Sequence, residues 1–282
     1  MRKVGFRDRA MQVLEQLPPL PAKATDLLAA VASRDIEARQ LVAIVARDSA
    51  LQPRVLELAN SGLFGRVRQI ESIPHAVGLI GPPTLRRYLI QWTVGGVLRD
   101  LPDVAGWDAA KFSAHAEAAA LLADNLCDHL PVGNGDGAFV AGLVHDIGKF
   151  VICAEAPDAI EFILAMRETT PESVSEIERD VLGIDHAGMS SVVAEKWRLG
   201  DDVCRAVSCH HEPHRDSSSG EIALSFVLSK SDAYVNGLGL SFLSSSPDAS
   251  TVLDWPGYQS EVDRALQWFE FGKGQLAISK QA

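Results

Sequence analysis

The sequence predicts an all-α protein, and three observations lead to that prediction. Apolar residues recur every three to four positions through most of the chain, which is the spacing of a buried helix face. No segment shows a convincing alternation of apolar and polar residues, as a half-buried strand would. Proline and glycine fall between the periodic segments or at their starts, where they end or begin helices. Together these features predict a multi-helix bundle preceded by an N-terminal helical lobe.

Five or six helices are predicted in the first hundred residues. They cover residues 8–16, 23–32, a segment starting at 35, residues 50–60, a segment starting at 72, and residues 85–98. The repeating apolar positions form one stripe on each helix, such as Leu41, Ile44 and Val45 on the helix that starts at residue 35. On the helix that starts at Ser72, the same spacing predicts that Ala76, Val77 and Leu79 face inward.

Prolines and glycines explain the boundaries of these helices. The segment Leu17-Pro18-Pro19-Leu20-Pro21 forces extended backbone after the first helix. Pro53 fits the first turn of its helix, where a missing N–H costs little. The stretch Asn60-Ser61-Gly62 ends that helix with residues that tolerate left-handed backbone. Gly81-Pro82-Pro83-Thr84 breaks the pattern before the last helix of this lobe.

The rest of the chain continues as helices. They are predicted over residues 109–130, 137–146, 149–153, 157–166, 172–182, 187–198, 201–210, 221–236 and 259–269. Polar segments rich in glycine or serine predict loops at residues 133–137, 217–220 and 241–250. The linker-like segment 102–107 is the predicted domain boundary, which divides the chain into an N-terminal lobe, 1–105, and a second lobe, 106–282.

Composition and charge restrict the class of protein. The chain has 282 residues, of which 47% are hydrophobic and 22% charged, a composition typical of globular proteins. The net charge of −11 argues against a general nucleic-acid binder. Residues 1–100 hold 14 Lys and Arg against 9 Asp and Glu, whereas the remainder holds 12 against 28. The basic lobe could receive the acidic lobe or an anionic partner, or the difference could be a chance fluctuation of surface charge.

The cysteines and the N-terminus predict a cytoplasmic location. The four cysteines, Cys127, Cys153, Cys204 and Cys209, form no C-x-x-C pair and no disulfide framework, so we expect reduced thiols. The first eight residues carry charge without an apolar core, which is not the pattern of a signal peptide. No run of about 18 apolar residues occurs, so we expect no membrane span.

The stretch Gly142-Leu143-Val144-His145-Asp146-Ile147-Gly148-Lys149 is the strongest candidate for a functional site. An apolar segment leads directly into adjacent His145 and Asp146, which can offer an imidazole nitrogen and a carboxylate oxygen to one divalent ion. Lys149 lies one helical turn after His145 and could hold an anion beside that ion. Alternatively, His145 and Asp146 only cap or solvate the end of a buried helix.

Further metal-ligating residues occur in the same lobe, at helix ends or beside apolar runs: His115, His186, His210, His211 and Asp232. Imidazole and carboxylate together suit Fe, Mn, Zn or Ni, whereas Ca and Mg prefer shells of oxygen alone. Each residue also has a structural interpretation. His115 could be a core histidine, Asp232 a hydrogen-bonded core carboxylate and His186 a helix cap. The adjacent His210 and His211 could be a polar helix end.

The order His115, His145-Asp146, Asp232 resembles the H…HD…D set of the HD superfamily of metal-dependent phosphohydrolases. Across residues 12–240 the chain more closely resembles the HD-related output domain, or HDOD, family. The similar segments are 17–21, 44–48, 56–61, 70–73 with 76–81, 183–186 and 209–213. This resemblance implies an all-α HD-type bundle and a bacterial signalling or regulatory output module with a protein partner.

A second resemblance concerns the ligands themselves. His186, His210 and His211 are similar to the extra histidines with which HD-GYP phosphodiesterases bind a second metal. The resemblance implies one or two transition-metal ions, with His115, His145 and Asp232 on one, His186, His210 and His211 on the other, and Asp146 bridging them. In those enzymes the lysine that matches Lys149 lies near the scissile phosphate, so Asp146 and Lys149 are the candidate catalytic residues.

Two positions depart from the HD-GYP pattern. No Gly-Tyr-Pro follows His211-Glu212, which weakens the case for recognition of cyclic-di-GMP, and Lys111 stands where some members have a glutamate ligand. We therefore expect a regulatory module with a retained mono- or dinuclear metal site, and we leave enzyme activity open. The alternatives are a metal-dependent phosphohydrolase or phosphodiesterase acting on a nucleotide or cyclic dinucleotide, and a module that binds such a ligand without hydrolysis.

Overall fold

The structure is a computed structural model of the chain, and it describes residues 14–16, 19–64, 69–99, 108–216, 222–240, 253–267 and 269. The fold is all-α, as predicted, and these described residues contain helices and one isolated bridge, Val132–Ile222, but no β-strand. Contacts between Cα atoms divide the chain into two compact units. The N-terminal unit comprises the described residues within 20–98, and the C-terminal unit comprises those within 99–270 together with 14–16 and 19.

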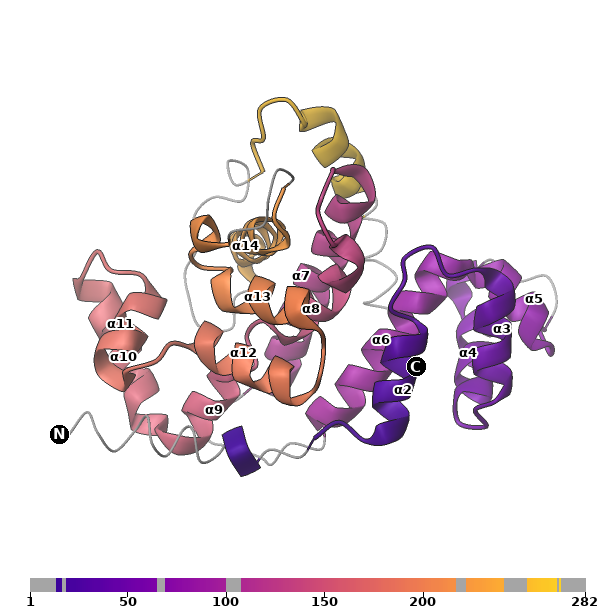
Figure 1. The fold of residues 1–282 in the computed structure, drawn as a ribbon, viewed down its shortest axis with the longest axis horizontal. Coiled ribbons are helices and arrows are strands. Elements are labelled where there is room, and N and C mark those ends of the chain that lie inside the picture. Colours follow the sequence, from indigo (N-terminus) through magenta and orange to yellow (C-terminus); the bar gives the residue numbers. More distant parts are fainter. Residues whose placement is uncertain are drawn as a thin grey trace. The chain divides into compact units, whose positions relative to one another are not determined.

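The N-terminal unit contains five helices among its described residues: α2 (Ala22–Ala30), α3 (Ala38–Ala46), α4 (Leu51–Asn60), α5 (Ile73–Ile80) and α6 (Pro82–Arg99) (Figure 1). A capping box in which Glu37 and Gln40 satisfy each other's backbone N–H groups starts α3. Gly81, with φ of 83°, separates α5 from α6, and α6 begins directly at Pro82. Pro82 therefore lies in the first turn of α6 rather than in a break before it, so this helix begins three residues earlier than predicted.

Of the residues predicted to face inward on α3, Leu41 and Val45 are buried and Ile44 is half-buried, whereas on α5 one predicted position is exposed. Ala76 and Val77 on α5 are buried, but Leu79 is 39% exposed and Ile80 takes the inward position instead. The prediction for Leu79 was therefore wrong. Ala76 and Ile80 are one helical turn apart, and this pair faces the neighbouring α3 and α4, so the stripe is rotated by one residue from the predicted one.

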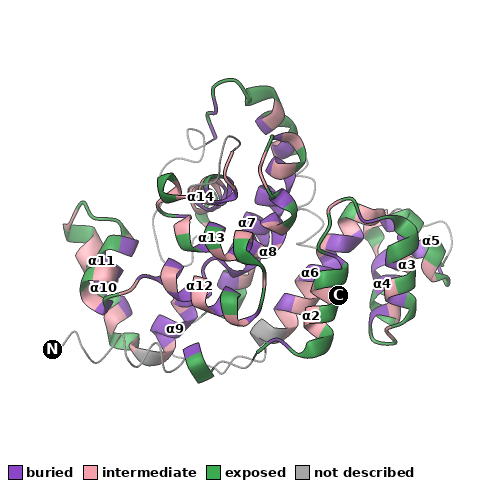
Figure 2. Cartoon of the chain, in the orientation of Figure 1, coloured by how far each residue is buried: buried purple, intermediate pink, exposed green. Residues whose placement is uncertain are grey.

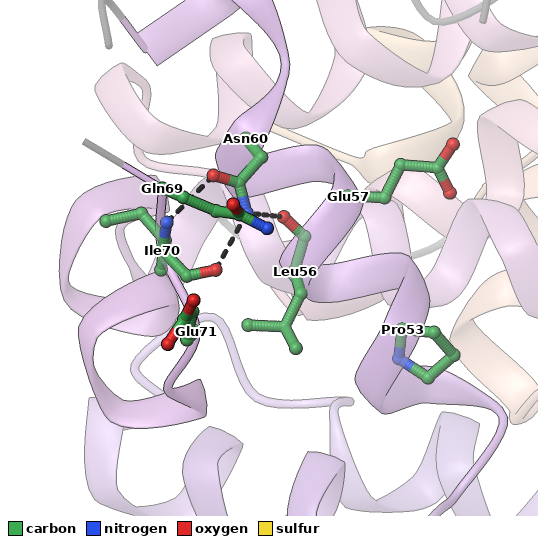
Figure 3. Close-up of a pocket in the computed structure, with 7 residues that line it drawn as sticks. All are labelled: Pro53, Leu56, Glu57, Asn60, Gln69, Ile70 and Glu71. Atoms are coloured by element: carbon green, nitrogen blue, oxygen red, sulfur yellow. Dashed lines mark hydrogen bonds between the residues drawn. The ribbon is translucent and has the colours of Figure 1, made fainter. Parts of the chain in front are cut away.

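Asn60, the last residue of α4, lies before η1 (Gly62–Phe64) and is hydrogen-bonded to Ile70, which lies before α5. Its side-chain amide donates to the carbonyl oxygens of Leu56 and Ile70, each at 2.8 Å, and its Oδ1 accepts from the Ile70 N–H at 2.8 Å (Figure 3). The side chain thus pairs with both backbone groups of Ile70, as a neighbouring strand would. A hollow of about 580 Å³ lies beside this contact and is lined by Pro53, Leu56, Glu57, Asn60, Gln69, Ile70 and Glu71.

The C-terminal unit is a longer series of helices. They are α7 (Ala109–His129), η2 (Gly135–Gly137), α8 (Ala138–Val144), α9 (Gly148–Glu155), α10 (Pro157–Thr169), α11 (Val174–Leu182), α12 (His186–Lys196), α13 (Asp201–Cys209), η3 (Pro213–Arg215), α14 (Leu224–Val235), η4 (Asn236–Leu240) and a helix over residues 259–267. Every predicted helix of this lobe corresponds to one of them, with boundaries that differ by at most three residues for those with assigned bounds.

The core of this unit lies where α7 packs against α8 and α14. In α8 all residues except Val140 are buried, and α7 is buried continuously from His115 to Leu126 (Figure 2). The segment Gly135–Ala154 is apolar and long enough to cross a membrane by those two criteria alone. It is divided among η2, α8 and α9, and 78% of its apolar window is buried inside the protein, so packing in the core accounts for its hydropathy.

Around this core, α12 packs on α9 and α13, while α10 and α11 form a hairpin that lies to one side of α12–α14 (Figure 1). Some predicted features lie outside the described residues: most of the helix at 8–16, the loops at 217–220 and 241–250, and the domain boundary at 102–107.

Candidate metal centre

The first group of candidate ligands comes from three helices that meet in the core. His115 lies on α7, His145 and Asp146 follow the end of α8, and Asp232 lies on α14. All four residues are buried. The close approach of α7 and α8 depends on Gly142, because a Cβ at this position would lie 2.3 Å from the Ala120 Cα. The glycine of the predicted motif therefore brings His145 next to His115.

The ligand atoms of this first group converge on one point. His115 Nε2 lies 3.3 Å from His145 Nε2, 3.1 Å from Asp232 Oδ1 and 3.5 Å from Asp146 Oδ2. His145 Nε2 lies 3.6 Å from Asp146 Oδ2 and 3.5 Å from Asp232 Oδ1. Ligands held about 2.0–2.2 Å from one ion would be separated from each other by about 3.0–3.6 Å. The spacing of the four atoms therefore fits a single transition-metal ion.

Hydrogen bonding leaves His145 ready to act as a ligand. Its Nδ1 lies 2.8 Å from the Gly142 carbonyl oxygen, which can only accept, so Nδ1 carries the hydrogen and Nε2 presents its lone pair to the group. Burial by itself would lower the pKa of His145, but the carboxylates of Asp146 and Asp232 outweigh burial and raise it. The two carboxylates therefore favour positive charge at this point, which a metal ion would supply.

Lys149 contacts the same carboxylate. Its Nζ donates to Asp146 Oδ2 at 2.5 Å, and its side chain is only 12% exposed. Burial would lower the pKa of Lys149, but Asp146 and Asp232 outweigh that effect and raise it, so the ammonium remains charged. Conversely, burial would raise the pKa of Asp146, whereas Lys149, His145 and His186 hold it well below its usual range. The predicted proximity of Lys149 to the His-Asp pair is therefore present in the structure.

The second group consists of three imidazoles: His186 at the start of α12, and His210 and His211 directly after α13. His186 Nε2 lies 2.7 Å from His211 Nε2 and 3.2 Å from Asp146 Oδ1. His210 Nδ1 donates to the Val207 carbonyl at 2.7 Å, so its Nε2 has a free lone pair. Burial and the neighbouring His145 and His186 lower the pKa of His210 to about 3, which keeps this imidazole neutral.

Two buried atoms near this second group have no hydrogen-bond partner: Asp146 Oδ1 and His210 Nε2. Buried polar atoms are rarely left unpaired, because each costs about 1–3 kcal/mol. A cation between them would satisfy both atoms. The donor set of the second group therefore also fits a metal ion, and Asp146 faces both groups with its two oxygens.

Gly148 brings the two groups together. A Cβ at this position would lie 2.1 Å from the His186 carbonyl oxygen, so only glycine allows α9 to start against α12. The Gly148 N–H donates to Ser190 Oγ on α12 at 2.8 Å and fixes this approach. The chain directly before Gly148 carries Asp146, so the same contact sets the distance from Asp146 to His186.

Glu178 on α11 is a further residue of the site that was not predicted from the sequence. This carboxylate is buried, and its Oε2 accepts from His186 Nδ1 at 2.5 Å and from the His186 N–H at 2.8 Å. One signal was available in the sequence, because Glu178 lies one turn before Leu182 on the apolar stripe of α11. A carboxylate on an apolar stripe requires a buried partner.

Comparison with known proteins identifies the family. A sequence profile of the HDOD domain matches residues 17–213, which is more than half of the chain. The chain belongs to the HDOD family. An uncharacterized protein of Treponema pallidum (strain Nichols) is 27% identical over 207 residues, which cover 71% of this chain and 39% of that protein. The chain therefore spans about two fifths of the length of this relative.

Solved structures show the same fold. An HDOD domain protein of unknown function from Geobacter sulfurreducens is 19% identical, with a TM-score of 0.71 and coverage of 99% of this chain and 96% of that one. A Shewanella amazonensis protein provisionally named a phosphohydrolase is 23% identical, with a TM-score of 0.64 and coverage of 95% and 98%. A Marinobacter aquaeolei protein provisionally named a signal transduction protein is 20% identical, with a TM-score of 0.68 and coverage of 99% and 65%. At these identities the likeness establishes the HDOD fold and no activity.

Proposed function

We propose that this HDOD protein is a bacterial signalling output module whose C-terminal unit binds two transition-metal ions. The convergence of seven ligand residues, six of them buried and His211 exposed, around the two oxygens of Asp146 supports this proposal most directly. The first ion would be held by His115, His145, Asp146 and Asp232, and the second by Asp146, His186, His210 and His211. The mixture of imidazole and carboxylate favours Fe, Mn, Zn or Ni over Ca and Mg.

A regulatory role is preferred because fold alone does not transfer activity, and because no Gly-Tyr-Pro segment follows His211-Glu212. The relative provisionally named a signal transduction protein has the same fold and supports the same context. The protein partner would bind the N-terminal unit, which contains none of the candidate ligands. We propose a cytoplasmic location, since no cysteine of the chain needs an oxidising compartment.

The alternative is a metal-dependent phosphohydrolase acting on a nucleotide or cyclic dinucleotide, and one contact favours it specifically. Lys149 Nζ lies 2.5 Å from Asp146 Oδ2, so a cation is already held beside the proposed ions, where it could stabilise charge on a phosphoryl group. Bound ions would supply Lewis acidity and an activated water. In this role Asp146 would bridge the ions, and Lys149 would bind and orient the phosphate oxygens.

Elemental analysis of the purified protein tests the metal proposal. We expect close to two equivalents of transition metal per chain, and we expect His145→Ala to lose the first ion. His75→Ala is the matched control, because His75 is an exposed histidine on α5 in the N-terminal unit. Absence of transition metal from protein purified without chelator, and after reconstitution with Mn²⁺, Fe²⁺ or Zn²⁺, would refute the proposal.

Two assays then separate the signalling module from the enzyme. A panel of cyclic dinucleotides, nucleotides and generic phosphodiesters is tested for turnover by the metal-loaded protein. Turnover that is lost in His145→Ala, and that falls about 100-fold or more in Lys149→Met with both ions retained, would establish the hydrolase. Lack of turnover, together with capture of a specific protein partner that survives His145→Ala, would establish the signalling module. Binding of a nucleotide in calorimetry, with the nucleotide recovered chemically unchanged after the titration, would identify binding without hydrolysis.

A further inference from the structure

The middle of α11 contacts His186 of the second group through Glu178, and the neighbours of His186 and His211 through Arg179. Glu178 is 1% exposed, and a single oxygen, Oε2, accepts from both Nδ1 and the backbone N–H of His186. A buried carboxylate is costly unless hydrogen bonds compensate for its lost hydration. Here one histidine supplies two such bonds, so the positions of Glu178 and His186 are fixed relative to each other.

The bond to Glu178 also determines which nitrogen of His186 can bind a cation. Since the carboxylate accepts, Nδ1 carries the hydrogen, and the lone pair of Nε2 points toward the second group. That nitrogen lies 2.7 Å from His211 Nε2 and 3.2 Å from Asp146 Oδ1. A carboxylate behind a ligand histidine also increases the basicity of the imidazole and its strength as a ligand.

Arg179, the next residue, connects the two segments that carry the histidines. Its Nε donates to Asp185 Oδ2 at 2.6 Å, and its Nη1 lies 2.5 Å from Glu212 Oε1. Asp185 directly precedes His186 and caps α12 by accepting from the Gly188 N–H at 2.8 Å. Glu212 directly follows His211. One guanidinium therefore sets the separation between the segment of His186 and the segment of His210 and His211.

The first group is positioned without α11. His115, His145 and Asp232 come from α7, α8 and α14, and the orientation of the His145 ring is fixed by the Gly142 carbonyl. Asp232 accepts from Asn236 Nδ2 at 2.8 Å on the following turn. A change in Glu178 or Arg179 therefore alters contacts of the second group and leaves these contacts of the first group in place.

We propose that Glu178 and Arg179 are positioning residues for the second metal ion only. Glu178 fixes the ring of His186 and strengthens it as a ligand, and Arg179 fixes the spacing between His186 and His211. This inference rests on the proposed function, because it requires that metal ions bind. It adds that the occupancy of one of the two ions is set by the α10–α11 hairpin, which lies to one side of the other helices around the site (Figure 1).

The test compares the affinities of the two ions in matched variants, measured by calorimetric titration of the metal-free protein with Mn²⁺ or Zn²⁺ and by elemental analysis after dialysis. Glu178→Gln retains an acceptor oxygen but removes the charge, and we expect about tenfold weaker binding of the second ion; for Glu178→Ala we expect about 100-fold. Arg179→Ala should weaken the binding of the second ion by about tenfold. The affinity of the first ion should change less than about twofold in each, since its ligands keep their contacts.

Glu176→Gln is the control for Glu178→Gln. Glu176 lies on the same helix and loses the same charge, but it is exposed, and glutamine can replace it in the capping box with Ser173. Both ions should bind this variant as they bind the wild type. The spin coupling of a Mn²⁺ pair, observed by electron paramagnetic resonance, gives a second readout. It should disappear in Glu178→Ala at a metal concentration that fills both sites of Glu176→Gln.

The outcomes separate this inference from the proposed function. Wild-type protein that binds no ion refutes the proposed function itself. Wild-type protein that binds two ions, with both affinities unchanged in Glu178→Ala, refutes only the positioning role. If Glu178→Gln weakens the binding of both ions equally and leaves the circular dichroism spectrum unchanged, the positioning role is also refuted. The effect would then not be confined to the second ion.

Discussion

Asp146 Oδ1 lies 3.2 Å from His186 Nε2, although the two residues are separated by forty positions in the sequence. The other oxygen of Asp146 faces His115 and His145, so one carboxylate is shared by both groups of candidate ligands. No other residue among the seven candidates is shared in this way within the described chain. A dinuclear site would therefore depend on Asp146. We expect substitutions of Asp146 and Asp232 to have different effects on metal binding.

Asp146→Ala should lose tight binding of both ions, whereas Asp232→Ala should weaken only the first. Asp232 Oδ1 lies 3.1 Å from His115 Nε2 and 3.5 Å from His145 Nε2, so it belongs to the first group alone. Elemental analysis after dialysis against Mn²⁺ or Zn²⁺ measures the number of retained ions. Asp158→Ala, which removes an exposed aspartate from α10, is the control. Two ions retained by Asp146→Ala would contradict the shared role.

Metal-free Asp146→Ala should also be less stable, because it leaves the buried Lys149 ammonium without its partner at 2.5 Å. Removing one member of a buried ion pair costs about 3–5 kcal/mol. The double variant Asp146→Ala with Lys149→Met should recover most of this loss, since no unpaired cation remains. Urea denaturation of the metal-free wild type, Asp146→Ala, Lys149→Met and the double variant gives the four free energies of unfolding. A double variant no more stable than Asp146→Ala alone would show that the pair is not the cause.

Much of the site could be predicted because its residue types are recognisable in the sequence. Histidine and aspartate stand out beside apolar segments, and the order His115, His145-Asp146, Asp232 limits how they can be arranged. The structure brings all seven predicted ligand residues into two groups around Asp146. Their role as metal ligands remains a prediction. Geometry within each group could not be predicted, because it depends on how closely α8 and α9 approach their neighbours at Gly142 and Gly148.

Other features were not predicted because they depend on packing rather than on pattern. Helix periodicity predicted α5 correctly but predicted that Leu79, rather than Ile80, would be buried. Both residues lie within one turn of the buried Ala76, and only packing against the neighbouring helices determines which of them is buried. The contact from Glu178 to His186 crosses the turn between α11 and α12, and no local rule requires it. The same is true of Asn60, whose partner Ile70 lies ten residues away.

Gly142→Ala should destabilise the C-terminal unit, because the added Cβ would lie 2.3 Å from Ala120 Cα and 2.6 Å from Ala120 N. Backbone cannot move aside as a flexible side chain can, so we expect a loss of about 1–3 kcal/mol or more. Gly78→Ala is a control of opposite sign: Gly78 is in the interior of α5 with no atom within 4 Å of the added Cβ. There, alanine should stabilise by about 0.5–1 kcal/mol. Chemical denaturation measures both, and a neutral Gly142→Ala would contradict the close approach of α7 and α8.

Asn60→Ala should destabilise the N-terminal unit by about 1–3 kcal/mol, because it removes three hydrogen bonds and leaves both backbone groups of Ile70 without this partner. Gln69→Ala is the control, since Gln69 borders the same hollow but is exposed. Hydrogen exchange of the Ile70 amide should accelerate in the first variant and remain unchanged in the second. Unaltered exchange at Ile70 in Asn60→Ala would show that the amide pairing does not hold this segment.

Cys153 should resist alkylation in the folded protein. Its side chain is buried on α9, and burial raises the pKa of its thiol to about 11. Since the thiolate is the reactive form, only about one molecule in a thousand would carry it at pH 8, and the reagent must also reach it. Cys209 is only half-buried and serves as the internal comparison. Mass spectrometry after treatment with iodoacetamide should find Cys209 modified and Cys153 intact until urea unfolds the chain. Rapid modification of Cys153 in native protein would contradict its protection by burial on α9.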